Sequence, residues 1–181
     1  SYCWPYYLAK KSEVAESVRL FDQESQALVE GEHNVLIVRT DREQLFVAGG
    51  FGEHCECRNW KRELTVRHCS SQNGLVESLF GVTFSIARRY AQTCGLPKHM
   101  WTHAHEHGVN VRNRFPTRSR NDEMPHEMLA GKKADLSRIR ACGCLAYELD
   151  DEIARGRKMD ARERKGVHLG EADASKGHLM W

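Results

Sequence analysis

The first third of the chain carries a helical pattern of apolar residues between two runs with strand character. Apolar residues recur at helical spacing from Val14 to Leu28, with Ser12 placed to cap that helix and Gly31 to end it. The aromatic run at residues 4–8 predicts a short strand before the helix. The sequence therefore predicts a strand, a helix over about 12–29 and a second strand.

That second strand is the most clearly marked one. Residues 34–40 are β-branched and apolar enough to predict a central strand, which ends on Asp41. The glycine-rich residues 48–52 predict a loop, and residues 64–66 predict a short strand. Together these elements indicate an α/β arrangement.

Two helices are predicted next. Gly74 opens a helical pattern over 75–93, which Cys94 and Gly95 close. A second helix begins at Leu96 and ends before Pro116, because the residue preceding a proline avoids helical geometry. Its predicted buried residues are Met100, Trp101, Ala104 and Val111.

The pattern changes in the last third of the chain. A polar connector at 117–122 precedes a helical turn over 125–129, which Gly131 closes. Residues 140–148, 165–170 and 177–180 predict short strands separated by charged loops. This spacing is typical of a small β-barrel.

Composition indicates a globular protein of one domain, or of one medium and one small domain. The 181 residues are 40% hydrophobic and 29% charged, with four prolines. No apolar run approaches the roughly 18 residues of a membrane span, and the N-terminus has no signal-peptide pattern. We read that N-terminus as a strand entered partway, as in a fragment. Seven cysteines without a secretory signal indicate free thiols and a nuclear or cytoplasmic location, not secretion.

Charge is informative only in its distribution. The net charge is +2, but residues 78–120 hold seven Lys or Arg and a single acid, Glu106. Such a stretch suits contact with DNA phosphates. A solvated helix face is the alternative interpretation.

Asp41 and Glu77 are candidate metal ligands. Asp41 ends a predicted strand, Glu77 lies in the first turn of a predicted helix, and 35 residues separate them. Phosphoryl transfer on nucleic acids commonly uses two divalent metals held by carboxylates. Spacing alone does not distinguish this pair from two unrelated surface acids among the 25 in the chain.

Short motifs in order along the chain resemble the integrase region of copia-type retrotransposon polyproteins. The residues Gln72-Asn73-Gly74 followed by Glu77 resemble the motif that holds the third catalytic carboxylate of that family, and Arg39-Thr40-Asp41 resembles the one that holds the second. The further matching segments are Lys11-Ser12-Glu13-Val14, Gly95-Leu96-Pro97-Lys98, Trp101, Asn113-Arg114-Phe115-Pro116-Thr117, Pro125-His126-Glu127, Gly131-Lys132-Lys133, Leu136-Ser137 and Gly143-Cys144-Leu145-Ala146-Tyr147.

The resemblance implies an α/β, ribonuclease H-like integrase core lacking its first strands, followed by a small SH3-like β-barrel. The implied segments are a truncated catalytic core at 1–121, a connector at 122–135 and the barrel at 136–181. By position, Asp41 and Glu77 would be catalytic residues and ligands of Mg²⁺ or Mn²⁺. The implied partner is DNA, with a homo-oligomer possible and no membrane. The expected nucleic-acid-binding residues are Gln72, Asn73, Arg88, Lys98 and Arg114.

Three departures from the family pattern predict weak or absent catalysis by a DDE-type strand transferase. The family's first catalytic Asp lies upstream of residue 1, which leaves fewer anionic ligands and predicts weak metal binding. Arg42 and Glu43 replace a glycine-rich turn after Asp41. Residues 78–81 are uncharged where the family is basic, which weakens phosphate contacts.

Other clusters suggest weaker hypotheses. Zinc binding by residues 54–57 with 68–69 is disfavoured by the tight Cys-x-Cys spacing. His103 and His107 predict an exposed polar helix face, with His105 pointing away from it. Cys142 and Cys144 predict one buried side of a strand. The charged residues 155–165 are typical of a solvated loop.

Three functions stay open at this point. The first is an integrase fragment that is inactive alone. The second is a non-catalytic nucleic-acid-binding module, and the third is a protein-interaction module that keeps the integrase fold.

Overall fold

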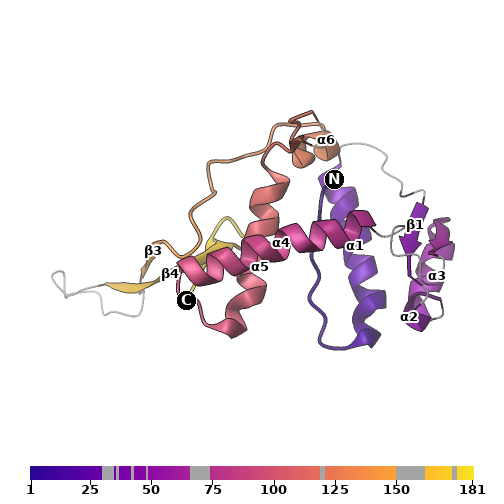
Figure 1. Ribbon diagram of the computed structural model, residues 1–181, viewed down its shortest axis with the longest axis horizontal. Coiled ribbons are helices and arrows are strands. Elements are labelled where there is room, and N and C mark those ends of the chain that lie inside the picture. The colour runs from indigo at the N-terminus through magenta and orange to yellow at the C-terminus, as the bar shows by residue number, and fades with distance from the viewer. Residues whose placement is uncertain are drawn as a thin grey trace. The chain divides into compact units, whose positions relative to one another are not determined.

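The computed structural model describes residues 1–29, 35, 37–41, 43–47, 49–65, 74–118, 121–149, 162–172 and 175–181. These residues form a mixed α/β protein, as predicted (Figure 1). The chain divides into two compact units: unit 1 holds 1–82 and 113–134, and unit 2 holds 83–112 and 135–181. The units group residues by spatial contact and do not follow chain order, so the predicted boundaries at 121 and 135 stay predictions.

Unit 1 begins with coil and a helix. The strand predicted at 4–8 is wrong, because residues 1–8 have no strand assignment. The backbone of Cys3 bonds to a side chain there: Asn113 Oδ1 accepts its N–H at 3.0 Å, and Asn113 Nδ2 donates to its carbonyl at 2.7 Å. The side-chain amide of Asn113 thus makes the backbone hydrogen bonds that a neighbouring strand would otherwise make.

The first helix is the turn η1, Lys11–Glu13, continued by α1, Val14–Leu28. Ser12 lies inside the turn and does not cap it. Glu13 caps the helix instead, since its Oε2 accepts the backbone N–H of Ala9 at 2.9 Å and of Lys10 at 3.3 Å. Gly31, the predicted stop, lies outside the described residues.

The sheet of unit 1 has two parallel strands in the described part of the chain. These are β1, Ile37–Thr40, and β2, Lys61–Leu64, with Ile37 opposite Lys61. The connection contains α2, Gln44–Val47, and α3, Gly50–Cys57. The predicted loop at 48–52 is therefore wrong from Gly50 onward. A Cβ on Gly50 would lie 2.9 Å from that of Ala15, so glycine lets α3 approach α1 closely.

The core of unit 1 joins these elements. Phe51, Cys55 and Trp60 are buried, and apolar residues of α1 and β1 pack against them. A separate helix, α6, Pro125–Ala130, ends at Gly131 with a left-handed φ of 68°, which confirms the predicted helical turn and its stop.

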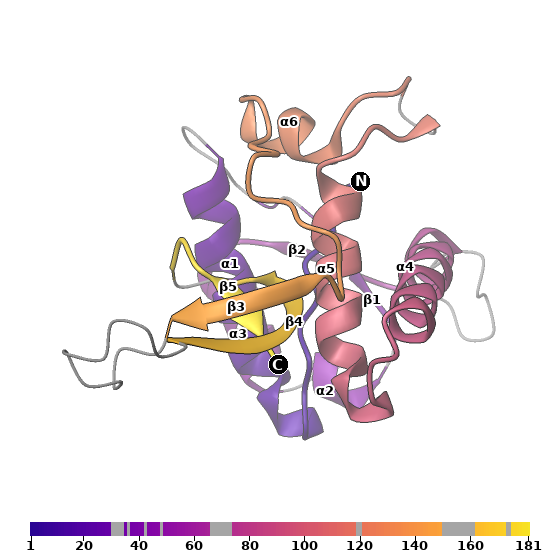
Figure 2. The ribbon, with the colours of Figure 1, turned by 90° about the vertical axis from the view of Figure 1, so that its left-hand side faces the viewer.

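Unit 2 combines parts of a helical pair with a small sheet. The long helix α4, Gly74–Thr93, matches its prediction, and the unit boundary falls within it. The turn η3, Lys98–Met100, leads into α5, Trp101–Asn113. The sheet has three antiparallel strands in the order β3, Leu145–Leu149; β4, Glu163–Glu171; and β5, His178–Met180. Figure 2 shows β3 alongside β4.

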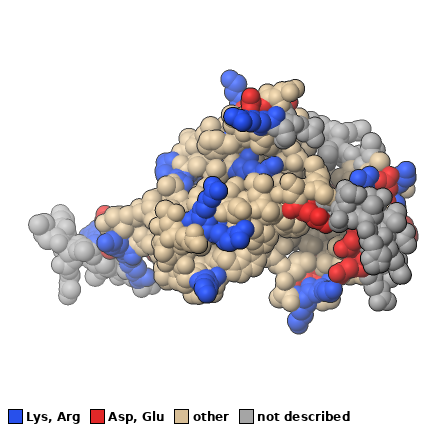
Figure 3. Space-filling view, in the orientation of Figure 1, with Lys and Arg blue, Asp and Glu red and all other residues tan. Residues whose placement is uncertain are grey.

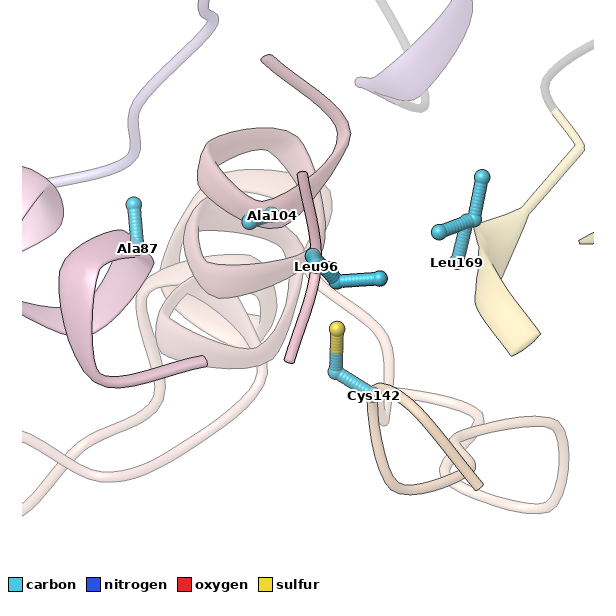
Figure 4. Close-up of a cluster of buried hydrophobic side chains, with 5 residues drawn as sticks. All are labelled: Ala87, Leu96, Ala104, Cys142 and Leu169. Carbon is cyan, nitrogen blue, oxygen red and sulfur yellow. The ribbon is translucent and has the colours of Figure 1, made fainter. Parts of the chain in front are cut away.

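Three strands form in the last third as predicted, although the first begins only at Leu145, and no closed barrel forms among the described residues. Instead, this sheet covers the helical pair. The buried core contains Ala87 from α4, Ala104 from α5 and Leu169 from β4, with Leu96 and Cys142 between them (Figure 4). In Figure 4 the side chains of Leu96, Cys142 and Leu169 point toward one another. Burial of these apolar groups joins the helices to the sheet.

Cys142 and Cys144 lie in a turn before β3, which corrects the predicted strand over 140–148. Six cysteines fall within the described ranges, and all six are free thiols. Within those same ranges, no helix combines the length and hydropathy needed to cross a membrane.

Candidate functional site

Asp41 directly follows β1 and is exposed. Its Oδ1 accepts the backbone N–H of Glu43 at 3.1 Å, which forms a local turn before α2. The Glu43 carboxylate in turn pairs with the ammonium of Lys11 at 2.9 Å. One oxygen of Asp41 therefore accepts a backbone N–H, and the ammonium of Lys11 contributes positive charge nearby.

Glu77 lies in the first turn of α4 and is exposed. The positive end of the helix dipole favours an acid there. Carboxylates are suitable ligands for Mg²⁺ or Mn²⁺, but no group of three or more His, Cys, Asp or Glu able to hold a metal exists among the residues described. The predicted roles of Asp41 and Glu77 therefore stay predictions. Gln72 and Asn73 lie outside the described residues.

The expected DNA-binding cations fall in different units. Arg88 on α4 and Lys98 on η3 belong to unit 2 and are exposed. Arg114 follows α5 in unit 1, where it is half-buried with His126 in its electrostatic neighbourhood. Figure 3 shows Lys and Arg side chains gathered over the C-terminal half of α4.

Trp101 is an exposed residue that the sequence pattern placed in the core. Its exposed fraction is 44%, and its ring stacks on that of Phe84, with centroids 5.8 Å apart and planes 24° apart. The predicted burial of Ala104 is confirmed at 0% exposed. Helical spacing puts Trp101 and Ala104 on the same side of α5. Trp101 is the first residue of that helix, at the edge of its buried side.

The exposed polar face predicted for His103 and His107 is wrong at His107, which is buried, whereas His103 is half-buried and His105, predicted to point away from that face, is buried. His105 is 3% exposed, with its Nε2 3.0 Å from Thr83 Oγ1, and His107 is 5% exposed. The ring of His107 lies 5.9 Å from that of His168, whose Nε2 is 3.1 Å from Nδ1 of His178. No sequence pattern signalled this cluster, because it joins α5 to β4 and β5.

Burial lowers the pKa of His105 and of His168, and the nearby His178 lowers that of His168 further. Arg140 acts in the same direction, whereas Glu171 and a backbone bond to Ala141 oppose it. The unfolded chain thus binds more protons than the folded one just below the ordinary histidine pKa of about 6.5. We expect the free energy of unfolding of unit 2 to fall as pH is lowered through that range.

Urea unfolding of the chain at several pH values, from above that range to below it, measures this slope. His168→Gln should reduce the slope, and His99→Gln, at an exposed position, should leave it unchanged. A stability that stays constant or rises on acidification would show that these rings are not held neutral.

Among the described residues of the zinc hypothesis, His54 and Cys55 have surroundings that disfavour metal binding. His54 Nε2 lies 3.2 Å from Asp22 Oδ2, and Cys55 is a core residue at 0% exposed. Burial raises the pKa of the Cys55 thiol, which disfavours a thiolate ligand. His68 and Cys69 lie outside the described residues.

Comparison with known proteins supports the resemblance inferred from the motifs. No protein-family model matches the chain. Over 180 residues it is 25% identical to the retrovirus-related Pol polyprotein from transposon TNT 1-94 of Nicotiana tabacum, an alignment that covers 98% of this chain and 13% of the polyprotein. The chain is thus similar to a small part of that relative.

Among solved structures, the chain is similar to one chain of the simian T-cell lymphotropic virus intasome. The TM-score is 0.55 with 12% sequence identity, and the match covers 97% of this chain and 64% of the intasome chain. The chain therefore shares its α/β fold with a retroviral intasome component. The two likenesses support an integrase-like region.

Proposed function

We propose that this chain is an integrase-related module that binds DNA and does not catalyse strand transfer by itself. The observation that carries the proposal is the charge of the α4–α5 segment. Arg88, Arg89 and Lys98 are exposed there, and no carboxylate occurs from residue 78 to residue 105. A positive stretch without carboxylates attracts phosphates and releases their counterions.

The comparisons favour DNA over other polyanions. An intasome shares the fold over nearly all of this chain, and the polyprotein relative is retrovirus-related. The proposal includes a ribonuclease H-like core and an SH3-like C-terminal part, a nuclear or cytoplasmic location and weak binding of Mg²⁺ or Mn²⁺ by Asp41 and Glu77. When bound, such an ion would activate an attacking oxygen in phosphoryl transfer.

The same carboxylates argue against catalysis by the isolated chain. One oxygen of Asp41 already accepts a backbone N–H, and Lys11 contributes positive charge to its neighbourhood. Within the described ranges no group of three or more His, Cys, Asp or Glu residues that could hold a metal occurs. Two metals close together need several carboxylates, so we expect low metal affinity and no measurable turnover.

Binding of a fluorescent DNA duplex, measured by anisotropy in EDTA, tests the proposal. We expect binding without metal, with an affinity that falls steeply as salt rises, because each phosphate contact contributes about −0.9 to the slope of log K against log salt. Arg88→Ala should reduce that slope by about one. A control at an exposed cation of unit 1, Arg19→Ala, should leave it unchanged.

Salt-insensitive binding, or none, would contradict the DNA-binding role. A strand-transfer assay on the same duplex with Mg²⁺ or Mn²⁺ distinguishes the catalytic alternative. Joined products that disappear in Glu77→Gln would refute the claim that the chain is inactive alone.

A protein-interaction role is the second candidate, favoured by exposed apolar residues at the start of α4. Leu75, Val76 and Phe80 are 69%, 47% and 54% exposed. Apolar groups that share one helix and face solvent are typical of protein interfaces, including those of homo-oligomers. Sedimentation that shows a monomer at all concentrations would remove the homo-oligomer from this candidate.

A further inference from the structure

Phe84 and Trp101 form an exposed stacked pair in unit 2, here called the aromatic platform. Phe84 belongs to α4 and Trp101 begins α5, and the two residues are 38% and 44% exposed. Their planes lie within 24° of each other at a centroid distance of 5.8 Å. The pair therefore presents aromatic surface to solvent from two helices of the same unit.

The platform is supported from behind by a buried polar contact. The ring of His105 lies 4.5 Å from that of Phe84, and His105 is 3% exposed. Its Nε2 is 3.0 Å from the Oγ1 of Thr83, which is 1% exposed. Because these groups fix the position of Phe84, little side-chain freedom is lost when a ligand stacks on the platform.

Each residue of the platform has a cation within one turn of it along the chain. Arg88 lies one turn after Phe84, and its Nε donates to the Phe84 carbonyl at 3.4 Å, which keeps the guanidinium on that side of α4. Lys98 lies one turn before Trp101 and is exposed. Both cations are therefore near enough in sequence to contact the phosphates of a strand whose base lies on the rings.

We propose that the aromatic platform binds an unpaired nucleotide of single-stranded DNA, with Arg88 and Lys98 on the adjoining phosphates. Aromatic rings beside cations are the usual means of holding single strands, since every base has a face for stacking. In a duplex those faces are covered by neighbouring bases, so the platform would contribute little there. The inference rests on the proposed DNA-binding function and names the form of DNA that this part of the surface prefers.

The test compares one oligothymidine of about 20 nucleotides with a duplex of equal length, each labelled with fluorescein. Binding to the full chain is measured by anisotropy. A stacked base contributes on the order of 1–3 kcal/mol, so Trp101→Ala should weaken single-strand binding about tenfold and change duplex binding less than about twofold. Trp101→Phe, which keeps a stacking ring, should retain most of the single-strand affinity.

Tyr147→Ala is the matched control, because Tyr147 is an aromatic residue of the same unit that is 58% exposed on β3. It should alter neither affinity. Circular dichroism establishes that each variant folds. Arg88→Ala should weaken binding of both DNAs, because phosphates are common to both.

Unchanged single-strand affinity in Trp101→Ala, or equal losses on both DNAs, would overturn the inference. So would a dimer that Trp101→Ala dissociates while single-strand affinity stays constant, because the platform would then be a protein interface. Duplex binding by the unaltered chain tests the proposed function separately. If that binding persists while Trp101→Ala has no selective effect, only the inference fails.

Discussion

Gly143→Ala is expected to destabilise unit 2 by roughly 3 kcal/mol, through backbone strain and a steric collision. Gly143 is the third residue of a β-turn closed by the Cys144 N–H and the Ala141 carbonyl at 3.2 Å, and its φ is +77°. That geometry favours glycine at this turn position. An added Cβ would lie 2.3 Å from both Cβ and Sγ of Cys94.

The collision is costly because Cys94 has little freedom to move. Its Sγ donates to the Cys142 carbonyl at 2.9 Å, and its side chain packs against the core that joins α4 to β4. Burial is the largest cause, and the neighbouring Cys94 the next, of a pKa of Cys142 that is raised to about 12, as expected of a thiol in a tightly packed site. Displacing Cys94 would therefore disturb the core itself.

Urea unfolding of the full chain measures the loss, and Gly95→Ala is the matched control. Gly95 has a φ of +63° in the same unit, but an added Cβ there has open space within 4 Å. We expect only the backbone cost, about 1 kcal/mol. Equal losses at the two glycines would show that Cys94 yields easily and that the collision contributes nothing.

The sequence predicted the elements whose patterns are local. The helix from Gly74 to Thr93 carries its own apolar spacing, and Gly131 marks the end of α6 by a backbone conformation that glycine adopts readily. The strand before Asp41 is rich in β-branched residues, and its described part, Ile37–Thr40, pairs as expected of a strand. These features depend on nearby residues alone.

The failures concern features decided by distant partners. Residues 4–8 have strand propensity, but Asn113, more than 100 positions away, bonds the backbone beside them. His107 sits on a helix face that appears polar in sequence, and it is buried because Tyr90 of α4 and His168 of β4 lie against its ring. Tertiary contacts override local preference in both cases.

The candidate site shows the same division. The positions of Asp41 and Glu77 at a strand end and a helix start follow from local pattern and are confirmed as placements. Exposure of Trp101 was missed, because a tryptophan among apolar helical positions is ordinarily expected inside. Whether that ring faces a core or solvent depends on where the neighbouring helix ends. The spacing of apolar residues within α5 does not predict that position.

Asp22→Ala is expected to destabilise unit 1 by about 3 kcal/mol, because Asp22 is a buried carboxylate that joins α1 to α3. Asp22 is 7% exposed. Its Oδ2 lies 2.9 Å from Arg58 Nε and 3.2 Å from His54 Nε2. Its Oδ1 accepts from Arg58 at 3.1 Å and from Gln26 at 2.6 Å. Alanine would leave several donors in a largely dry site without this acceptor.

The expected loss for Asp22→Ala lies at the lower end of the range for buried ion pairs, because the Arg58 side chain is 36% exposed and recovers some hydration. A surface ion pair on the same helix supplies the control. Glu16 lies 3.2 Å from Arg19, with side chains 66% and 53% exposed, so Glu16→Ala should change the free energy of unfolding by less than about 1 kcal/mol.

The double variant Asp22→Ala with Arg58→Ala separates the ion pair from the remaining contacts of Asp22. If the loss comes chiefly from stranding the guanidinium, removing Arg58 as well should restore part of the stability that Asp22→Ala loses. Strict additivity would show that Gln26 and His54 carry the effect. Because Val38 of β1 packs on the core that α1 and α3 enclose, this loss should also loosen the strand that ends at Asp41. Faster amide exchange along β1 in Asp22→Ala, with β4 unchanged, is the expected sign.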